Sequence, residues 1–215
     1  MLLIADMARA DGGDGDSAPV PERPAILFNR WQEDWSVLAD PRIAKEPYDA
    51  LKYIPLSVDD PKTYLSFGAD IRERFETNDA VGFGIRPNRS ADYVISRTEL
   101  HADLRVASQL QVFAQFQSDF APWKSMLTPV DRDRLDLEQG FVALVEPLEN
   151  GTLKLRLGRQ QFAFDLQRFV SVRDGPNIRQ SYDAAWADYE RGPWRFITFY
   201  SQPVQARDQI GRAHV

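Results

Sequence analysis

A two-residue alternation of apolar and polar side chains dominates the chain from residue 63 onward. Between residues 64 and 76, for example, Leu65, Phe67 and Ile71 alternate with charged or small residues. This period predicts β-strands with two chemically different faces. A soluble sheet shows it when one face covers a core and the other meets water. A transmembrane barrel shows it with the apolar face toward lipid and the polar face toward a wet lumen.

The lengths of the alternating segments and of their connections favour the barrel. Strands of roughly 9 to 14 residues suit a tilted membrane crossing better than the globular mean of about 5 to 6. The connections alternate between long and short, as in outer-membrane barrels, and Asn150-Gly151 suits a tight hairpin. We therefore predict an all-β, antiparallel up-and-down transmembrane β-barrel, here a partial barrel of about seven strands. The expected strands are about 64–76, 93–106, 110–120, 136–145, 152–160, 179–189 and 194–201.

Composition excludes several other classes of protein. The net charge of −6 argues against a nucleic-acid partner, because such proteins usually carry a basic surface. The absence of cysteine excludes disulfides and thiolate metal sites. No apolar run approaches the roughly 20 residues of a membrane-spanning helix. No nucleophile, base and orienting group occur together, so the sequence predicts no enzymatic activity, no catalytic residue, no metal site and no cofactor.

The chain divides into four expected parts. Residues 1–24 are interpreted as a clipped signal peptide or flexible linker, with a plain disordered tail as the alternative. Residues 25–62 are expected to form an ordered periplasmic lead-in, and residues 63–209 the N-terminal part of the barrel. The final "IGRAHV" matches the translation of a common sequencing adapter, so residues 210–215 are expected to be an artefact of a longer gene. A genuine polar C-terminus is the alternative.

Several segments resemble the alginate export family of outer-membrane barrels. They include "RWQEDWSVLADP", "YLSFGADIRERFE", "LRLGRQQF", "VSVRDGPNIRQSYD" and "YERGPWRFITFYSQPV". The resemblance implies a bacterial outer-membrane channel of roughly 18 strands, within the known range for such barrels. It implies that an anionic polysaccharide or a smaller solute passes through. The implied partners are outer-membrane lipid, this saccharide or solute, and periplasmic export machinery.

Members of this family are thought to attract the polyanion with arginines inside the lumen. A guanidinium suits this task because it stays charged and binds a carboxylate through two parallel hydrogen bonds. Arg159 belongs to the "GRQ" element of the fifth expected strand, and Arg173 and Arg179 flank "DGPN" in a long loop that can fold back toward the pore. The positions that match by parity on the strands are Arg72, Arg74, Arg97, Arg105, Lys154 and Arg156.

Acidic residues on the same faces leave alternative readings open. Asp70, Glu76, Glu99 and Asp103 share the parity of the predicted lumen cations. The charges could therefore form cross-strand salt bridges that stiffen the wall. A general or nutrient-uptake porin of the same architecture and a soluble carbohydrate-binding β-sandwich remain alternative functions. An aromatic girdle near the strand ends is also expected, formed by Trp123, Trp186, Trp194 and Tyr200.

Overall fold

The computed structural model of the protein describes residues 19–79, 91–164, 166–168 and 170–205. Most of the predicted leader, most of the first long loop and the predicted artefact at 210–215 lie outside these residues. The strands are β1 (Ile54–Pro55), β2 (Tyr64–Asn78), β3 (Ala91–Val106), β4 (Leu110–Phe120), β5 (Asp133–Leu148), β6 (Gly151–Gln160), β7 (Tyr182–Arg191) and β8 (Trp194–Pro203).

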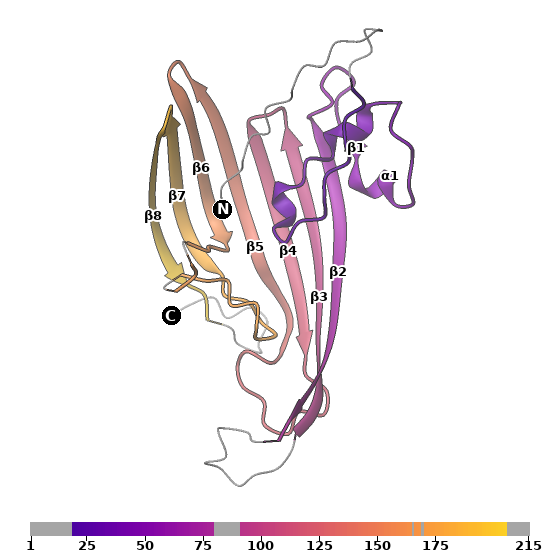
Figure 1. The fold of residues 1–215 in the computed structure, drawn as a ribbon, viewed down its shortest axis with the longest axis vertical. Coiled ribbons are helices and arrows are strands. Elements are labelled where there is room, and N and C mark those ends of the chain that lie inside the picture. The colour runs from indigo at the N-terminus through magenta and orange to yellow at the C-terminus, as the bar shows by residue number, and fades with distance from the viewer. Residues whose placement is uncertain (1–18, 80–90, 165, 169, 206–215) are drawn as a thin grey trace.

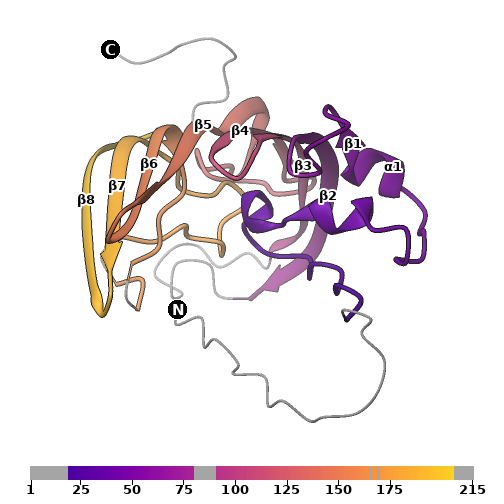
Figure 2. The same cartoon turned by 90° about the horizontal axis from the view of Figure 1, so that it is seen from above.

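All these strands form one sheet in sequence order, and every neighbouring pair is antiparallel. The sheet curls strongly, and in Figure 2 its cross-section is an open arc with β2 and β8 on opposite sides. The predicted fold class is confirmed: all-β, antiparallel and up-and-down, in an unclosed sheet that corresponds to part of a β-barrel. The sandwich alternative is wrong for the described residues, because they form a single layer of strands.

The strands differ from the prediction in three places. The additional strand β1 has only two residues, too few for any periodicity, and pairs with the start of β2. Strand β5 is longer than predicted, and its alternation is poor because its register with β4 shifts near Phe116 and again near Asp119. Strand β7 begins at Tyr182, so Arg179 lies in the preceding loop.

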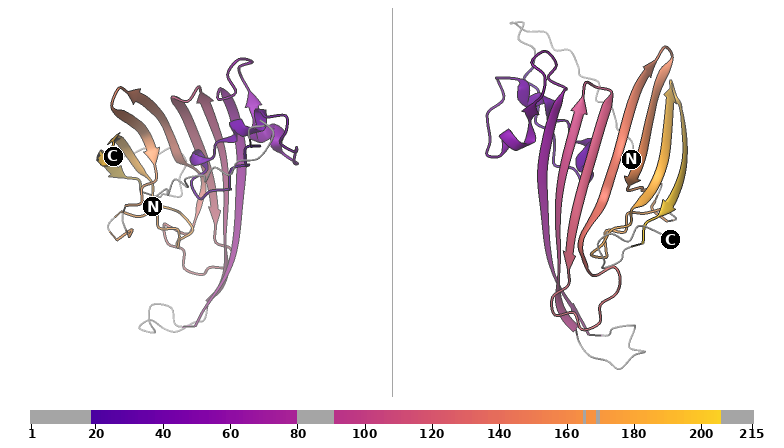
Figure 3. Two further views of the ribbon diagram at one scale, coloured as in Figure 1. Left: turned by 45° about the horizontal axis from the view of Figure 1, so that its top comes forward. Right: turned by 180° about the vertical axis from the view of Figure 1, so that it is seen from behind.

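The two faces of the sheet have opposite chemistry. On the convex face apolar side chains are exposed, among them Ile71, Leu100 and Leu157, which are 70%, 56% and 67% exposed. The concave face carries buried polar side chains such as Glu99 and Gln115. Figure 3 shows the sheet from two further sides. This distribution is the reverse of a soluble sheet with an apolar core and matches the pattern of a barrel in lipid.

The predicted alternation of connections is confirmed and gives the sheet two different rims. Short turns at 107–109, 149–150 and 192–193 lie at one rim, at the top of Figure 1. The long connections 121–132 and 161–181 leave from the opposite rim. Trp194 stacks on Phe196 on the convex side near the short-turn rim. Trp186 does not join such a girdle, because it is paired with Arg156 and shares its concave face.

The segment before β2 is ordered and packs at the short-turn rim (Figure 1). It contains the 3-10 helices η1 (Arg30–Gln32) and η2 (Trp35–Ala39) and the short helix α1 (Asp49–Lys52). Trp35, Leu38 and Ile43 of this segment form a small apolar cluster with Tyr64 of β2. Within the described residues, no helix has both the length and the apolarity needed to cross a membrane.

Candidate functional site

The predicted lumen cations on the strands lie on the concave face. Arg72 and Arg74 come from β2, Arg97 and Arg105 from β3, and Lys154 and Arg156 from β6. Strand pairing explains this placement, because a period of two puts alternate residues on the same side of the sheet. Whether any of these side chains contacts a solute stays a prediction.

Arg159 differs from this set, because it shares the parity of Leu155 and Leu157 rather than that of Arg156. Its guanidinium donates to Asp183 at 2.8 Å and to the carbonyl oxygen of Leu137 at 3.0 Å. These contacts connect β6 with β5 and β7 near the long-loop rim. They give Arg159 a role in joining strands.

The connection 161–181 folds back across the concave face (Figure 2). Near its start, Phe162 and Phe164 pack against Phe199 of β8, with ring centroids 5.5 Å and 5.0 Å away. Phe162 also packs against Tyr182 at 5.7 Å. These aromatic contacts direct the loop inward rather than away from the rim. Arg173 lies exposed on this loop.

The tip of the loop, residues 174–177, lies against arginines of β2 and β3. Arg72 donates to the carbonyl oxygen of Asp174 at 3.2 Å, and Arg74 donates to that of Gly175 at 2.7 Å. Arg97 donates to the carbonyl oxygens of Pro176 at 2.8 Å and Asn177 at 2.7 Å. These hydrogen bonds satisfy carbonyl oxygens of a turn that does not pair with a strand. We call Arg72, Arg74, Arg97 and Arg179 the arginine cradle.

The side chain of Asp174 is the centre of this cradle. Its Oδ1 accepts hydrogen bonds from Arg97 Nη1 and Arg179 Nε, both at 2.8 Å, while Arg72 Nη1 lies 3.3 Å from Oδ2. Burial of the carboxylate opposes its ionisation. The hydrogen bonds from Arg97 and Arg179 outweigh burial and lower the pKa of Asp174 below its ordinary value. The carboxylate is therefore held in its charged form.

Arg179 connects the cradle to acidic residues of the wall. Its Nη1 donates to Glu99 of β3 at 2.8 Å and lies 3.8 Å from Glu138 of β5. Burial disfavours the charged guanidinium, yet Glu99, Glu138 and Asp174 outweigh burial and raise the pKa of Arg179. The guanidinium lies 4.4 Å from the ring centroid of Phe28 in the lead-in. The loop and the lead-in therefore meet on the concave face.

Asn177 locks the base of the loop tip into the wall. Its side-chain amide donates to the carbonyl oxygens of Ser96 at 3.0 Å, Phe120 at 3.0 Å and Asp131 at 3.1 Å. The side chain is fully buried. These side-chain bonds do not involve the arginines, although Arg97 also holds the backbone carbonyl of Asn177, so the tip has a fixed root at Asn177 and a charged contact at Asp174.

A second cluster holds the lead-in near the short-turn rim. Arg105 donates to the carbonyl oxygens of Trp31 at 2.8 Å and Glu33 at 2.9 Å. The guanidinium of Arg156 lies 3.8 Å from the ring centroid of Trp31 and 5.3 Å from that of Trp186. Arginine over an aromatic face is attracted by the ring quadrupole. These predicted lumen cations therefore bind a segment of the chain itself.

The concave face is mixed in sign, as the sequence indicated. Lys154 pairs with Glu190 at 3.0 Å, and Arg30 of the lead-in pairs with Asp70 at 2.8 Å. Cross-strand ion pairs therefore do occur, as the alternative reading expected, but Arg72, Arg74 and Arg97 are directed mainly at the loop tip. Within the described residues, no cluster of histidine and acidic side chains is suited to a metal ion.

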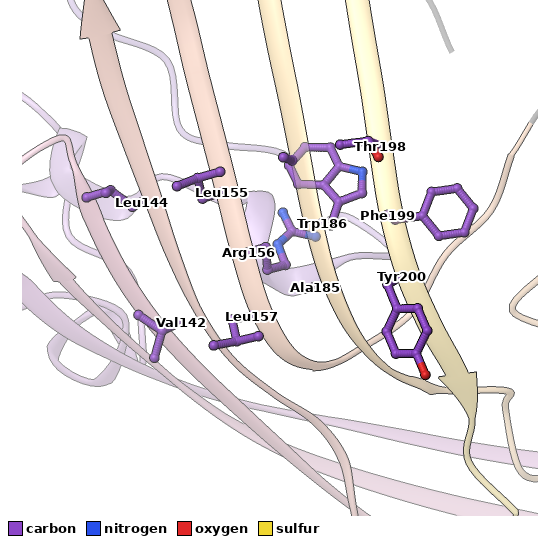
Figure 4. A pocket seen from close by; sticks show the side chains of 11 residues that line it. Val142, Leu144, Leu155, Arg156, Leu157, Ala185, Trp186, Thr198, Phe199 and Tyr200 are labelled. Carbon is purple, nitrogen blue, oxygen red and sulfur yellow. The ribbon is translucent and has the colours of Figure 1, made fainter.

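A shallow groove of about 550 Å³ runs over β5 to β8 (Figure 4). At β7 it is lined by the small residues Ala185 and Ala187. The groove is lined mainly by convex-face side chains, such as Leu155, Leu157 and Tyr200. Arg156 and Trp186 are also among its lining residues, but most of the lining is apolar, which suits acyl chains rather than a hydrated anion. The candidate path for a polar solute is therefore the concave face.

A family model described as alginate export matches residues 63–212. The chain belongs to the alginate export family. The match covers β2 to β8, which carry most of the cradle. Alginate export proteins are outer-membrane transport proteins, so membership supports an outer-membrane location and a general role in polysaccharide export. No curated protein and no solved structure matches the chain.

For this alginate export protein, sequence reasoning identified the cradle arginines but missed their partner. Asp174 lies in a loop without periodicity, so no pattern indicated that its carboxylate would face Arg97 and Arg72. The available signal was the clustering of Arg173, Asp174 and Arg179 around a Gly-Pro turn. Trp31 was likewise placed only in an ordered lead-in, with no indication of its contact to Arg156.

Proposed function

We propose that the chain forms part of the wall of an outer-membrane channel for an anionic saccharide of the alginate type. The observation that carries the proposal is the cluster of Arg72, Arg74, Arg97 and Arg179 on the concave face of a sheet whose convex face is apolar. A pore lined with such groups lowers the electrostatic barrier to anions. Membership of the alginate export family also supports a channel for a saccharide of this class.

The chemistry of a polyuronate suits this surface. Each sugar carries one carboxylate, which a guanidinium can bind through paired hydrogen bonds. Acidic neighbours such as Glu99 and Asp70 keep the net field moderate, so a bound chain is not held too tightly to move on. Conduction requires binding that is favourable enough for entry and weak enough for release.

A second candidate is a porin for small nutrients on the same architecture. The mixed sign of the concave face favours it, because Lys154, Arg30 and Arg179 each have a nearby carboxylate. Such pairing reduces the advantage of an anion over a neutral sugar. For the first candidate, the saccharide export channel, we also propose periplasmic export machinery as a partner.

Flux measurements on the full-length protein in liposomes separate the two candidates. We expect uronate trimers to enter several-fold faster than maltotriose, a neutral sugar of similar size, with the preference falling as salt is raised. Equal flux of both sugars at low salt would favour the nutrient porin. Retention of the protein in the soluble fraction after cell lysis would exclude both channels.

A further inference from the structure

The arginine cradle is a carboxylate site that is already filled. Arg97 and Arg179 are 1% and 10% exposed, and both direct a donor to the same oxygen of Asp174 at 2.8 Å. Arg72, which is 26% exposed, lies on the other carboxylate oxygen at 3.3 Å. This convergence of guanidiniums on one carboxylate is the geometry that binding of a solute carboxylate would need.

We propose that Asp174 is a tethered occupant of a uronate carboxylate site formed by Arg72, Arg97 and Arg179, and that a passing uronate displaces it. The inference rests on the proposed function and specifies its binding site and its gate. When Asp174 occupies the cradle, the tip 174–177 narrows the path. When a solute carboxylate replaces it, the tip moves off the arginines and the path widens.

The structure shows why the side chain of Asp174 can leave while the loop remains attached. Asp174 is 48% exposed, so a solute can approach it from the lumen. Apart from the chain neighbours of Gly175, no described residue places a heavy atom within 4 Å of where its Cβ would stand. Asn177, by contrast, is fully buried and holds the root of the tip through three hydrogen bonds. The tip can therefore pivot about Asn177 once the hydrogen bonds from the arginines to the carbonyl oxygens of residues 174–176 break.

The alternative is that Asp174 only staples the loop to the wall. The two roles predict opposite effects of Asp174→Asn. A staple that is removed loosens the loop but leaves the affinity for uronate unchanged. A tethered competitor that is removed leaves the site open to the solute carboxylate, because a neutral amide accepts weaker hydrogen bonds from the guanidiniums than a carboxylate does.

The test measures block of ionic current by trigalacturonate in planar bilayers that contain the full-length protein. For Asp174→Asn, we expect the half-blocking concentration to fall about tenfold relative to the wild type. The variant keeps the shape of the side chain and the carbonyl contacts of residues 174–177, so we expect it to fold. Heat-modifiable mobility on gels checks that it does. Maltotriose should block the two channels equally.

Asp70→Asn is the matched control, because Asp70 is a concave-face carboxylate of similar exposure, 45%, that pairs with Arg30 outside the cradle. It removes the same charge and should leave the half-blocking concentration within about twofold of the wild type. An equal gain in both variants would show a general charge effect and overturn the proposal. So would an unchanged or higher half-blocking concentration in Asp174→Asn.

A second variant tests the site itself. Asp174→Asn combined with Arg72→Gln should lose most of the gain, because the vacated site then lacks its most accessible guanidinium. Persistence of the full gain would contradict the assignment of Arg72 to the site. Failure of the proposed function can be distinguished from failure of this inference. If the proposed function is wrong, the wild type shows no uronate flux. If only this inference is wrong, Asp174→Asn has the same half-blocking concentration as the wild type.

Discussion

Arg97 is almost completely buried, and its guanidinium lies between the loop tip and Asp119 of β4. Asp119 is 0% exposed, and Arg97 Nε lies 3.8 Å from its Oδ1. Removing one partner of a buried ion pair is costly, because the other charge remains without compensation. Asp119 therefore makes Arg97 a structural residue of the wall as well as a member of the cradle.

We predict that Arg97→Met lowers the free energy of unfolding by about 3–5 kcal/mol, the range for breaking a buried pair. Urea unfolding of the full-length protein in phospholipid vesicles measures the change. Adding Asp119→Asn should recover part of the loss, because the uncompensated charge is then removed. Lys154→Met is the control, since its pair with Glu190 is more than one-third exposed and contributes less than about 1 kcal/mol. A similar cost for both single variants would contradict the argument.

Among the elements, the lead-in is held by several anchors, and Trp31 is one of them beside the cluster of Trp35, Leu38 and Ile43 on Tyr64. Its ring meets Phe141 edge-on at 5.9 Å and lies under Arg156 at 3.8 Å. Its carbonyl oxygen accepts from Arg105 and Gln111, contacts that survive a change of the side chain. The indole therefore helps to hold the lead-in on the concave face, and the backbone contacts remain when the indole is removed.

We predict that Trp31→Ala releases the lead-in without unfolding the sheet. Loss of a fully buried aromatic typically costs about 3–5 kcal/mol, so the partly buried Trp31 should cost less, and the cost should fall on the lead-in rather than on β2 to β8. Protease should cleave residues 25–40 at least tenfold faster in the variant, while β2 to β8 stay resistant. Trp123→Ala is the control, because Trp123 is 79% exposed in the connection 121–132. Cleavage at the wild-type rate would mean that η2 and α1 suffice to hold the segment.

The elements show which parts of the structure were predictable from sequence. The two-residue alternation in the sequence located β2, β3, β4, β6 and β8. It did so because one face of each strand has apolar surroundings and the other has polar surroundings. The pattern weakened in β5, where shifts of register against β4 exchange the faces of successive residues. It could not position loop 161–181 or the lead-in, whose places depend on long-range contacts such as Arg97 with Asn177 and Arg156 with Trp31.

At the scale of the whole molecule, the sheet inverts the usual distribution of polarity. Its concave side holds charged networks, a folded-back loop and the lead-in, while its convex side exposes leucine and phenylalanine. Among the described strands β8 pairs only with β7, and in a bilayer its other edge would need hydrogen-bond partners, since unsatisfied groups in hydrocarbon cost several kcal/mol each. We therefore expect further strands to pair with β8 in the membrane-inserted barrel.

On the convex face, the cost of an introduced arginine should depend on its depth in the membrane. Leu100 lies in the middle of β3 and Val106 at its end beside the short turn, and both side chains point outward. In lipid, arginine costs about 2–4 kcal/mol at the midplane and about 0–1 kcal/mol near the interface. Leu100→Arg should therefore lower the free energy of unfolding in vesicles by about 2–4 kcal/mol, and Val106→Arg by less than about 1 kcal/mol. Because a convex face in water would tolerate arginine equally at both positions, equal costs would show that this face does not contact lipid.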